Sequence, residues 1–182
     1  MKSFQERLLK DFDVKQKFIN GRMKNVYVYK GKYAVWDAEP DLLKRFRRIH
    51  LGGGILAILL LVWGALQEVP VNASHLVGFF TLVSCVLMAA FLYGVISFCR
   101  SEEQMYLRDC KMMRDIILWC GMTYALMMIA NVVCGIGYLV REGATVRSVF
   151  TLVAYLISGM AVFLIYLVQL RLSYLEIEKQ RN

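Results

Sequence analysis

The sequence predicts an all-α membrane protein, a bundle of four transmembrane helices with an N-terminal cytosolic amphipathic helix and a small β-hairpin. Two observations predict this class. Of the 182 residues, 58% are hydrophobic and 20% are charged, a more apolar composition than that of most soluble domains. The charged residues also gather mainly in three stretches, and four long apolar blocks contain no Asp, Glu, Lys or Arg.

The apolar blocks define the predicted spans. A helix needs about 20 mostly apolar residues to cross the hydrocarbon core of a bilayer. Backbone amides find no water partner in lipid, so each span is expected to be helical. The four predicted spans are residues 51–66, 76–98, 116–140 and 149–170. The chain is thereby divided into a cytosolic or interfacial segment (1–49), a four-helix transmembrane domain (50–171) and a cytosolic tail (172–182).

Lysine and arginine are distributed unequally between the connections. Residues 1–49, 99–115 and 171–182 hold thirteen, four and three of them, whereas residues 67–75 hold none and 141–147 hold two. Because cytosolic loops are enriched in Lys and Arg, this twenty-to-two division predicts that both termini are cytosolic. The first span follows a long polar segment, so it is expected to act as an uncleaved signal anchor. A plasma (inner) membrane is favoured over an internal eukaryotic membrane.

Residues 3–20 are expected to form the amphipathic helix. Ser3 and Glu6 suit a capping box, and Gly21 suits the C-terminal end. Two placements are left open: the helix lies in the membrane interface with its lysines near anionic headgroups, or it packs against this protein or a partner. Its apolar stripe consists of Phe4, Leu8, Leu9 and Phe12.

Residues 25–36 are expected to form the hairpin, with Lys30-Gly31-Lys32 as the turn between two alternating segments. A lone hairpin is marginal in water, so something must cover its aromatic residues. The headgroup region and a docking partner both suit aromatic side chains. The candidates for interface or partner contacts are therefore Phe4, Leu8, Phe12, Tyr27, Tyr29 and Trp36.

Three further boundaries follow from local signals. Pro40 suits the first turn of a helix that runs along the interface or straight into the first span. At Gly52-Gly53-Gly54, a hinge or a close helix contact is expected to offset a helix cost of roughly 1 kcal/mol per glycine. Ser101 and Gln104 suit a capping box, so the third helix is expected to begin near Glu102. The fourth is expected to continue into the C-terminal tail.

Polar, uncharged side chains recur at helical spacing in the last three spans. They either face each other and hold the bundle together, or line a lumen within the bundle or between copies. Asn131 is the costliest of them to leave unpaired in lipid, which makes it the strongest candidate for a key contact. The candidates for these bundle or lumen contacts are Asn131, Tyr124, Ser158, Tyr155 and Ser84.

Several classes of site lack their residues in this sequence. No ionisable Asp, Glu, Lys, Arg or His lies at the middle of a span, which argues against proton-coupled transport. No phosphate-binding loop, Ser-His-Asp set or metal-ligand cluster is found, so the sequence predicts no catalytic residue, cofactor or metal and favours a non-enzyme. The five cysteines are expected to be free thiols. The basic residues are explained by orientation, so no nucleic acid partner is expected.

These observations favour a non-enzymatic subunit or scaffold of a membrane complex. The alternative is a self-associating small channel whose polar stripes line a shared lumen. In either case, the expected partners are the lipid bilayer and other membrane-protein subunits or further copies of the chain. A third hypothesis is an enzyme acting on headgroups, which would need a polar pocket near Arg48 and His50.

Overall fold

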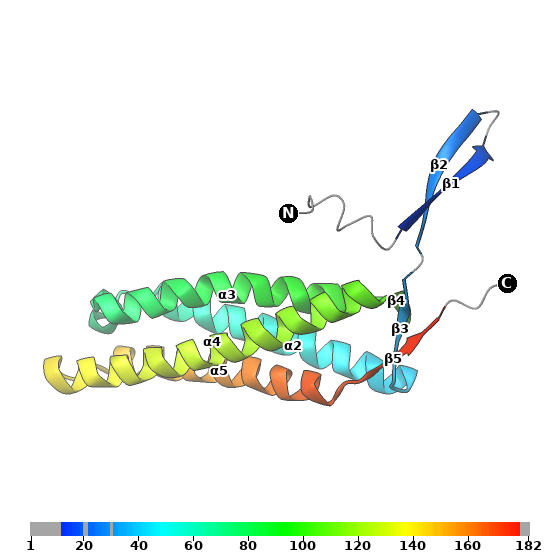
Figure 1. The fold of residues 1–182 in the computed structure, drawn as a ribbon. Helices are drawn as coiled ribbons and strands as arrows, with labels where there is room; N and C mark the ends of the chain where they lie inside the picture. Colours follow the sequence, from blue (N-terminus) through cyan, green and yellow to red (C-terminus); the bar gives the residue numbers. More distant parts are fainter. Residues whose placement is uncertain (1–11, 20–21, 30, 179–182) are drawn as a thin grey trace.

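Four long helices form an antiparallel bundle in the computed structural model, which describes residues 12–19, 22–29 and 31–178, the first two ranges as backbone only (Figure 1). They pack in a closed ring in which α3 contacts α4, α4 contacts α5, α5 contacts α2, and α2 contacts α3. The helices are α2 (Pro40–Ala65), α3 (His75–Arg100), α4 (Leu107–Glu142) and α5 (Val146–Arg171).

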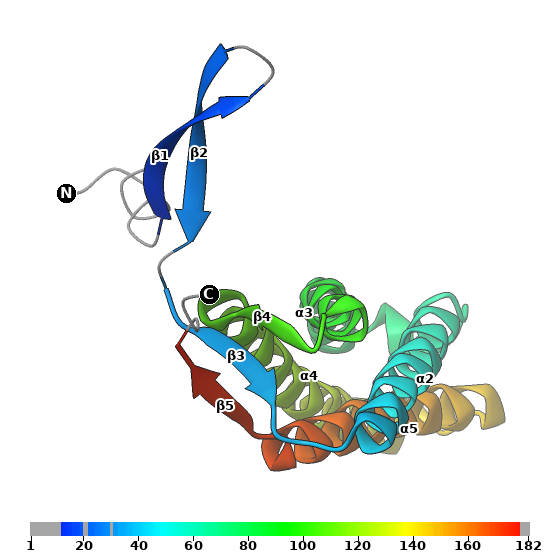
Figure 2. The same ribbon diagram turned by 90° about the vertical axis from the view of Figure 1, so that its right-hand side faces the viewer.

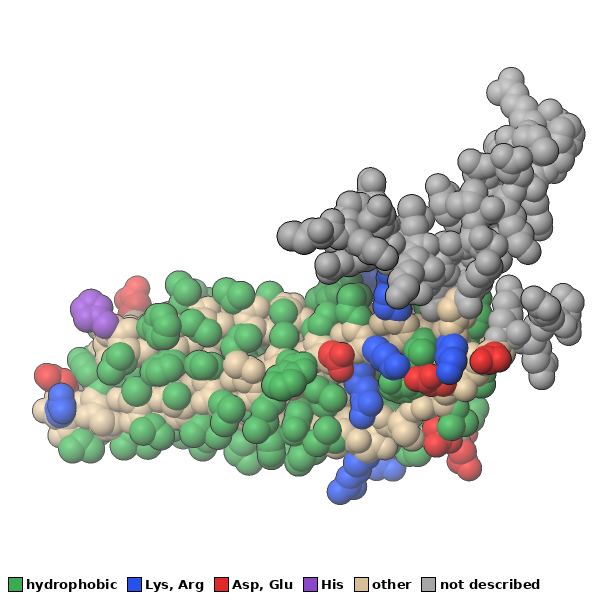
Figure 3. Space-filling model, viewed as in Figure 1, with side chains coloured by type: hydrophobic (Ala, Val, Ile, Leu, Met, Phe, Trp, Pro, Cys, Tyr) green, Lys and Arg blue, Asp and Glu red, His purple; other side chains and the backbone are tan. Residues whose placement is uncertain are grey.

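The four predicted spans are confirmed as long apolar helices. Within the described residues, each of the four is long and apolar enough to cross a membrane, with mean hydropathy between 1.7 and 2.3. Hydrophobic side chains cover the length of the bundle, whereas Lys, Arg, Asp and Glu gather mainly at one end (Figure 3). We call this the sheet end, because a small sheet lies there, and the opposite end the loop end.

Local signals position the helix ends. Pro40 occupies the first turn of α2, as predicted, and α2 continues without a break through the three glycines. A Cβ on Gly54 would lie 3.2 Å from the Leu92 side chain of α3, so a close helix contact explains this glycine. At the loop end, the short helix η1 (Pro70–Ala73) connects α2 to α3. The Thr145 side chain caps α5 by accepting a hydrogen bond from the Ser148 amide.

The sheet at the other end combines three segments that are distant in sequence. The central strand β3 (Tyr33–Trp36) pairs antiparallel with β4 (Gln104–Tyr106) on one side and with β5 (Tyr174–Ile177) on the other. Figure 2 looks onto this end and shows the three strands in front of the helix ends. The sheet therefore holds together the chain before α2, the connection between α3 and α4, and the chain after α5.

The N-terminal predictions need correction. The helix predicted over 3–20 is wrong for residues 12–19, which form strand β1 (Phe12–Ile19); residues 1–11, with Phe4 and Leu8, lie outside the described residues. The predicted 25–36 hairpin is also wrong, since β1 pairs with β2 (Arg22–Tyr29), while β3 belongs to the other sheet. The alternating residues were recognised as strands, but their partners were not.

Two helix boundaries also differ from the prediction. α4 begins at Leu107 and not near Glu102, because residues 104–106 form β4 and no side chain caps the helix. α5 ends at Arg171, and the following residues form β5 and not a further helical turn. In both cases, pairing with β3 satisfies backbone groups that a longer helix would otherwise have bonded internally.

Side-chain contacts fix the sheet to the bundle. The Glu176 carboxylate of β5 accepts from Lys111 Nζ of α4 at 3.1 Å and from Lys32 Nζ at 3.5 Å. The hydrogen bond from Lys111, followed by the contribution of Lys32, lowers the pKa of Glu176 below its ordinary value. The guanidinium of Arg114 lies 5.8 Å from the centre of the Tyr174 ring. Strand β5 is thus attached to α4 as well as to β3.

Candidate functional site in the bundle interior

Polar residues form three hydrogen-bonded groups along the interior of the bundle. The first lies at the sheet end, where His50 of α2 and Gln169 of α5 are both fully buried. His50 Nδ1 lies 2.8 Å from the Phe46 carbonyl oxygen, and Nε2 lies 2.9 Å from Gln169 Oε1. The ring of Phe98 covers the imidazole, with 4.8 Å between the ring centres. The pair therefore bridges α2 and α5 out of contact with solvent.

The tautomer of a neutral His50 follows from its two neighbours. A neutral imidazole carries one N–H, and the Phe46 carbonyl can only accept, so Nδ1 must donate and Nε2 must accept. Nε2 then needs a donor, which the Gln169 amide supplies when its oxygen and nitrogen exchange places. Gln169 Nε2 is buried without a partner in the orientation shown. With a neutral imidazole, the exchanged orientation gives that nitrogen an acceptor.

The second group lies near the middle of the helices and joins three of them. The hydroxyl groups of Tyr124 (α4) and Ser158 (α5) are 2.5 Å apart. Ser158 Oγ donates to the Ala57 carbonyl of α2 at 2.8 Å, so Tyr124 is the donor to Ser158. Both side chains are fully buried. Both predicted site residues therefore direct their hydroxyl groups to partners within this chain.

The third group lies toward the loop end. Asn131 Nδ2 of α4 donates to Thr81 Oγ1 of α3 at 2.9 Å. Tyr155 Oη of α5 donates to Asn72 Oδ1 at 3.2 Å, and Asn72 Nδ2 donates to the carbonyls of Gly64 and Gln67 at 2.9 and 2.8 Å. Asn72 thus ties the loop after α2 to α5. Its amide nitrogen is held by two backbone acceptors, one at the end of α2 and one in the following loop.

The structure places the residues predicted for bundle or lumen contacts in the bundle interior, in separate groups and not in one cluster. Asn131, Tyr124, Ser158, Tyr155 and Ser84 are all fully buried inside one chain. Two atoms of this set, Asn131 Oδ1 and Ser84 Oγ, are buried without a hydrogen-bond partner in the described structure. These five side chains carry hydroxyl and amide groups only, which suit hydrogen bonds between helices.

Of the residues predicted for interface or partner contacts, the structure describes the side chain of Trp36 alone. Trp36 is only 6% exposed and packs edge-on against Phe98, with 5.4 Å between ring centres. It therefore belongs to the contact between sheet and bundle, where neither lipid headgroups nor a partner reach it. Phe12, Tyr27 and Tyr29 lie in β1 and β2, where only the backbone is described, and Phe4 and Leu8 fall outside the described residues.

Sequence reasoning missed the roles of His50 and Asn72. A usable signal exists for His50, because the buried residues of α2 recur at intervals of three, four or seven: Leu43, His50, Gly54, Ala57, Leu61 and Gly64. This spacing places His50 on the inner face of the helix and not at the membrane surface. For Asn72 no local signal exists, since its partners come from α2, the following loop and α5.

No metal site is formed by the described residues, because no group of three or more His, Cys, Asp or Glu side chains lies close enough to bind an ion. The five cysteines carry free thiols. Comparison of the chain with protein-family models, with curated proteins and with solved structures found no match.

Replacing Asn131 with leucine is expected to leave the free energy of unfolding within about 1 kcal/mol of the original. The substitution removes one hydrogen bond, worth about 1 kcal/mol, but also removes a buried acceptor whose desolvation costs a similar amount. Denaturant unfolding in a mild detergent measures the change. A loss of several kcal/mol would show that Asn131 Oδ1 has a partner of its own. Asn131→Asp, which buries a charge, is the destabilising comparison.

Proposed function

We propose that the protein is a non-enzymatic subunit or scaffold of a membrane complex, in which the bundle anchors a small cytosolic sheet that binds a protein partner. The outer face of that sheet carries the proposal. In an antiparallel sheet, residues that lie opposite each other share a face. Tyr33 lies opposite Tyr106 and Ile177, and Val35 lies opposite Gln104 and Leu175. Five of these six residues are aromatic or aliphatic.

This face points away from the bundle. The intervening residues Ala34 and Trp36 are buried against the helices, and Glu176, opposite Ala34, binds Lys111 of α4. On the outer face, Leu175 is 56% exposed, Tyr106 40% and Ile177 37%. Exposed apolar groups gathered on one surface typically mark an interaction site. Lipid surrounds the sides of a membrane-spanning bundle, so a face beyond the helix ends is better suited to another protein.

The hydrogen bonds in the bundle interior favour the scaffold over a pore. A lumen shared between copies would require the polar stripes to lie on the outside of each chain. Tyr124, Ser158 and Asn131 are instead buried within one chain and bonded to neighbouring helices. The interior is therefore used to join helices, and we propose the scaffold in preference to the self-associating channel.

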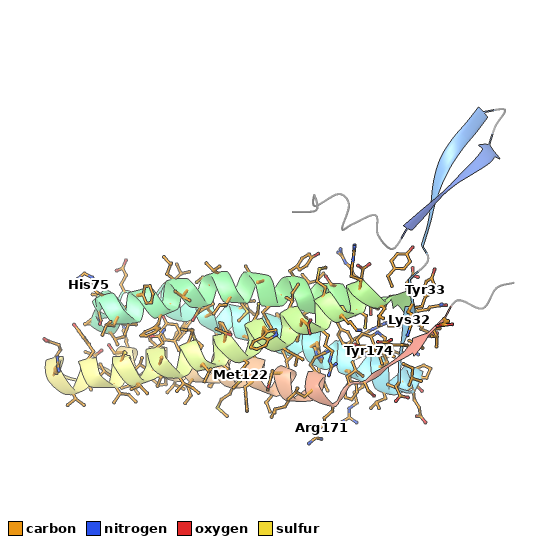
Figure 4. All side chains as sticks on the ribbon, viewed as in Figure 1. Lys32, Tyr33, His75, Met122, Arg171 and Tyr174 are labelled. Atoms are coloured by element: carbon orange, nitrogen blue, oxygen red, sulfur yellow. The ribbon has the colours of Figure 1, made fainter. Side chains whose placement is uncertain are left out.

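Orientation and location are part of the same proposal. α2 begins and α5 ends at the sheet end, so the chain enters and leaves the bundle on one side (Figure 1). The excess of Lys and Arg on that side supports a cytosolic sheet and cytosolic termini. Figure 4 shows Lys32, Tyr33 and Tyr174 at this end and His75 at the other. We propose a plasma (inner) membrane as the location.

The Leu175→Glu variant is expected to lose its partner subunit while keeping its fold. Leu175 lies on the outer face of an edge strand, so a charge there disrupts the apolar surface without entering the core. Extraction in mild detergent followed by co-purification measures the retained partner, and circular dichroism measures helix content. Leu42→Glu, at a position in α2 that is 42% exposed near the same end, is the matched control. A monomeric protein without any associated subunit would contradict the proposed function.

A further inference from the structure

A groove runs along the sheet end between the edge of β4 and the α3–α4 contact. Two adjoining hollows of ≈ 380 and ≈ 390 Å³ form it, and both are lined by Met105 and Asp109. Three methionines contribute to its walls, and methionine side chains adapt readily to an occupant. Tyr33, Glu102, Gln104 and Tyr106 line the first hollow as well, and Met112 and Met113 line the second.

The charge of the groove differs from that of its surroundings. Its charged lining residues are Glu102 and Asp109, and no described Lys or Arg side chain lines either hollow. Asp109 also forms an exposed ion pair with the neighbouring Arg108, with 3.8 Å between Arg108 Nε and Asp109 Oδ1. The same end of the bundle otherwise carries exposed arginines, such as Arg45 of α2, Arg100 of α3 and Arg171 of α5. An acidic, methionine-lined groove on a basic surface is suited to a basic amphipathic segment, which places its apolar face in the groove and its cations at the acidic rim.

We propose that this groove binds residues 1–11 of the same chain. These residues contain three basic side chains (Lys2, Arg7 and Lys10) and two acidic ones (Glu6 and Asp11), together with the apolar Phe4 and Leu8. The basic residues complement Glu102 and Asp109, and the apolar pair complements the methionines. The groove shares Tyr33, Gln104 and Tyr106 with the outer sheet face. The two proposals are tested at different positions, Leu175 for the partner and residue 4 for the groove, so each can fail separately.

The topology of the hairpin brings this segment to the groove. Phe12, the first residue of β1, lies opposite Tyr29, the last residue of β2. Directly opposed residues are about 5 Å apart, and the four steps from Tyr29 to Tyr33 span at most about 14 Å. Tyr33 itself lines the groove. The hairpin therefore returns the start of β1, and with it the end of the N-terminal segment, to the vicinity of the groove.

The short tether also favours intramolecular binding. Because the hairpin brings the end of the segment close to the groove, the segment is present there at an effective concentration in the millimolar range, so weak contacts suffice to occupy the groove. Arg7 and the lysines would otherwise meet anionic headgroups. Membrane contact is therefore the outcome that the experiment must distinguish from binding in the groove.

Photo-crosslinking of the full-length protein in lipid nanodiscs tests the proposal. Benzoylphenylalanine in place of Phe4 reacts with neighbouring C–H bonds on illumination, and mass spectrometry identifies the attached peptide. The expected product joins residue 4 to the peptide that contains Met105 or Met112 of the same chain. Adducts only with lipid, or only with a second copy of the chain, would overturn the proposal.

Exchanging the charges of the groove and the segment provides a second test of the proposal. The Glu102→Lys/Asp109→Lys variant is expected to lower the crosslink yield by roughly fivefold or more, since two exposed ion pairs become repulsive. Adding Lys2→Glu and Lys10→Glu is expected to restore it. Asp115→Lys changes charge equally on α4, but Asp115 does not line the groove, so its yield should equal that of the unaltered chain. An unchanged yield in the Glu102/Asp109 variant would contradict the assignment.

Discussion

The Gly159→Ala variant is expected to destabilise the bundle by about 1–3 kcal/mol, the cost of overpacking a well-filled interior. A Cβ on Gly159 of α5 would lie 2.8 Å from the Cβ of Met128 in α4. Neither atom can move by side-chain rotation, because each is attached directly to the backbone. The two helices must therefore separate, and that loss exceeds the gain of about 1 kcal/mol in helix propensity that alanine brings.

Gly137→Ala is the matched control and is expected to change stability in the opposite direction. Gly137 lies in α4, and a Cβ added there would meet nothing within 4 Å. Only the propensity gain applies, so the variant is expected to be more stable by about 0.5–1 kcal/mol. Unfolding by denaturant in one detergent, monitored by circular dichroism, measures both changes. Equal effects at the two positions would contradict the close α4–α5 contact at Gly159.

The spans were predictable because their signal is local. Hydrophobic blocks free of charge correspond to helices, and the predicted range 76–98 differs from α3 (His75–Arg100) by one or two residues at each end. The close contact at Gly159 was not predictable in the same way. A glycine in a span has the same sequence signature whether it lies on the surface, as Gly137 does, or between helices.

The strands of the three-stranded sheet were missed because their pairing is not local. The sequence predicts that the residues of β5 continue the fourth helix, and these residues are compatible with a helix. They form a strand because they pair with β3, which lies about 140 positions earlier in the chain. The β1–β2 hairpin, by contrast, had a local signal. Asn20-Gly21, the pair between the two strands, is typical of hairpin turns, but Gly21 was interpreted as the end of a helix.

The burial of Trp36 has the same physical origin. As part of a lone hairpin it would need lipid or a partner to cover it. The return of β5 from the far end of the chain supplies Tyr174, whose ring centre lies 6.3 Å from that of Trp36, and α3 supplies Phe98. Trp36 is therefore buried by residues of its own chain, which no local sequence pattern connects to it.

Removing either His50 or Gln169 alone is expected to destabilise the protein by about 1–3 kcal/mol, whereas removing both together should cost much less than the sum. His50→Leu leaves the Gln169 amide buried without its partner, and Gln169→Leu leaves the His50 Nε2 atom in the same position. An orphaned buried polar group costs its full desolvation energy, whereas two apolar replacements of similar shape are nearly neutral. The single effects should therefore not be additive.

A double-mutant cycle on the free energy of unfolding measures this coupling, with His50→Leu and Thr151→Val as the control pair. Thr151 is buried on α5 like Gln169, but its hydroxyl donates to the Arg147 carbonyl of its own helix. Sites without shared partners are expected to be additive within about 0.5 kcal/mol. Coupling at His50–Gln169 alone would identify this pair as the polar contact that holds α2 to α5 beneath the sheet. Additivity there would instead mean that each group finds its partner elsewhere.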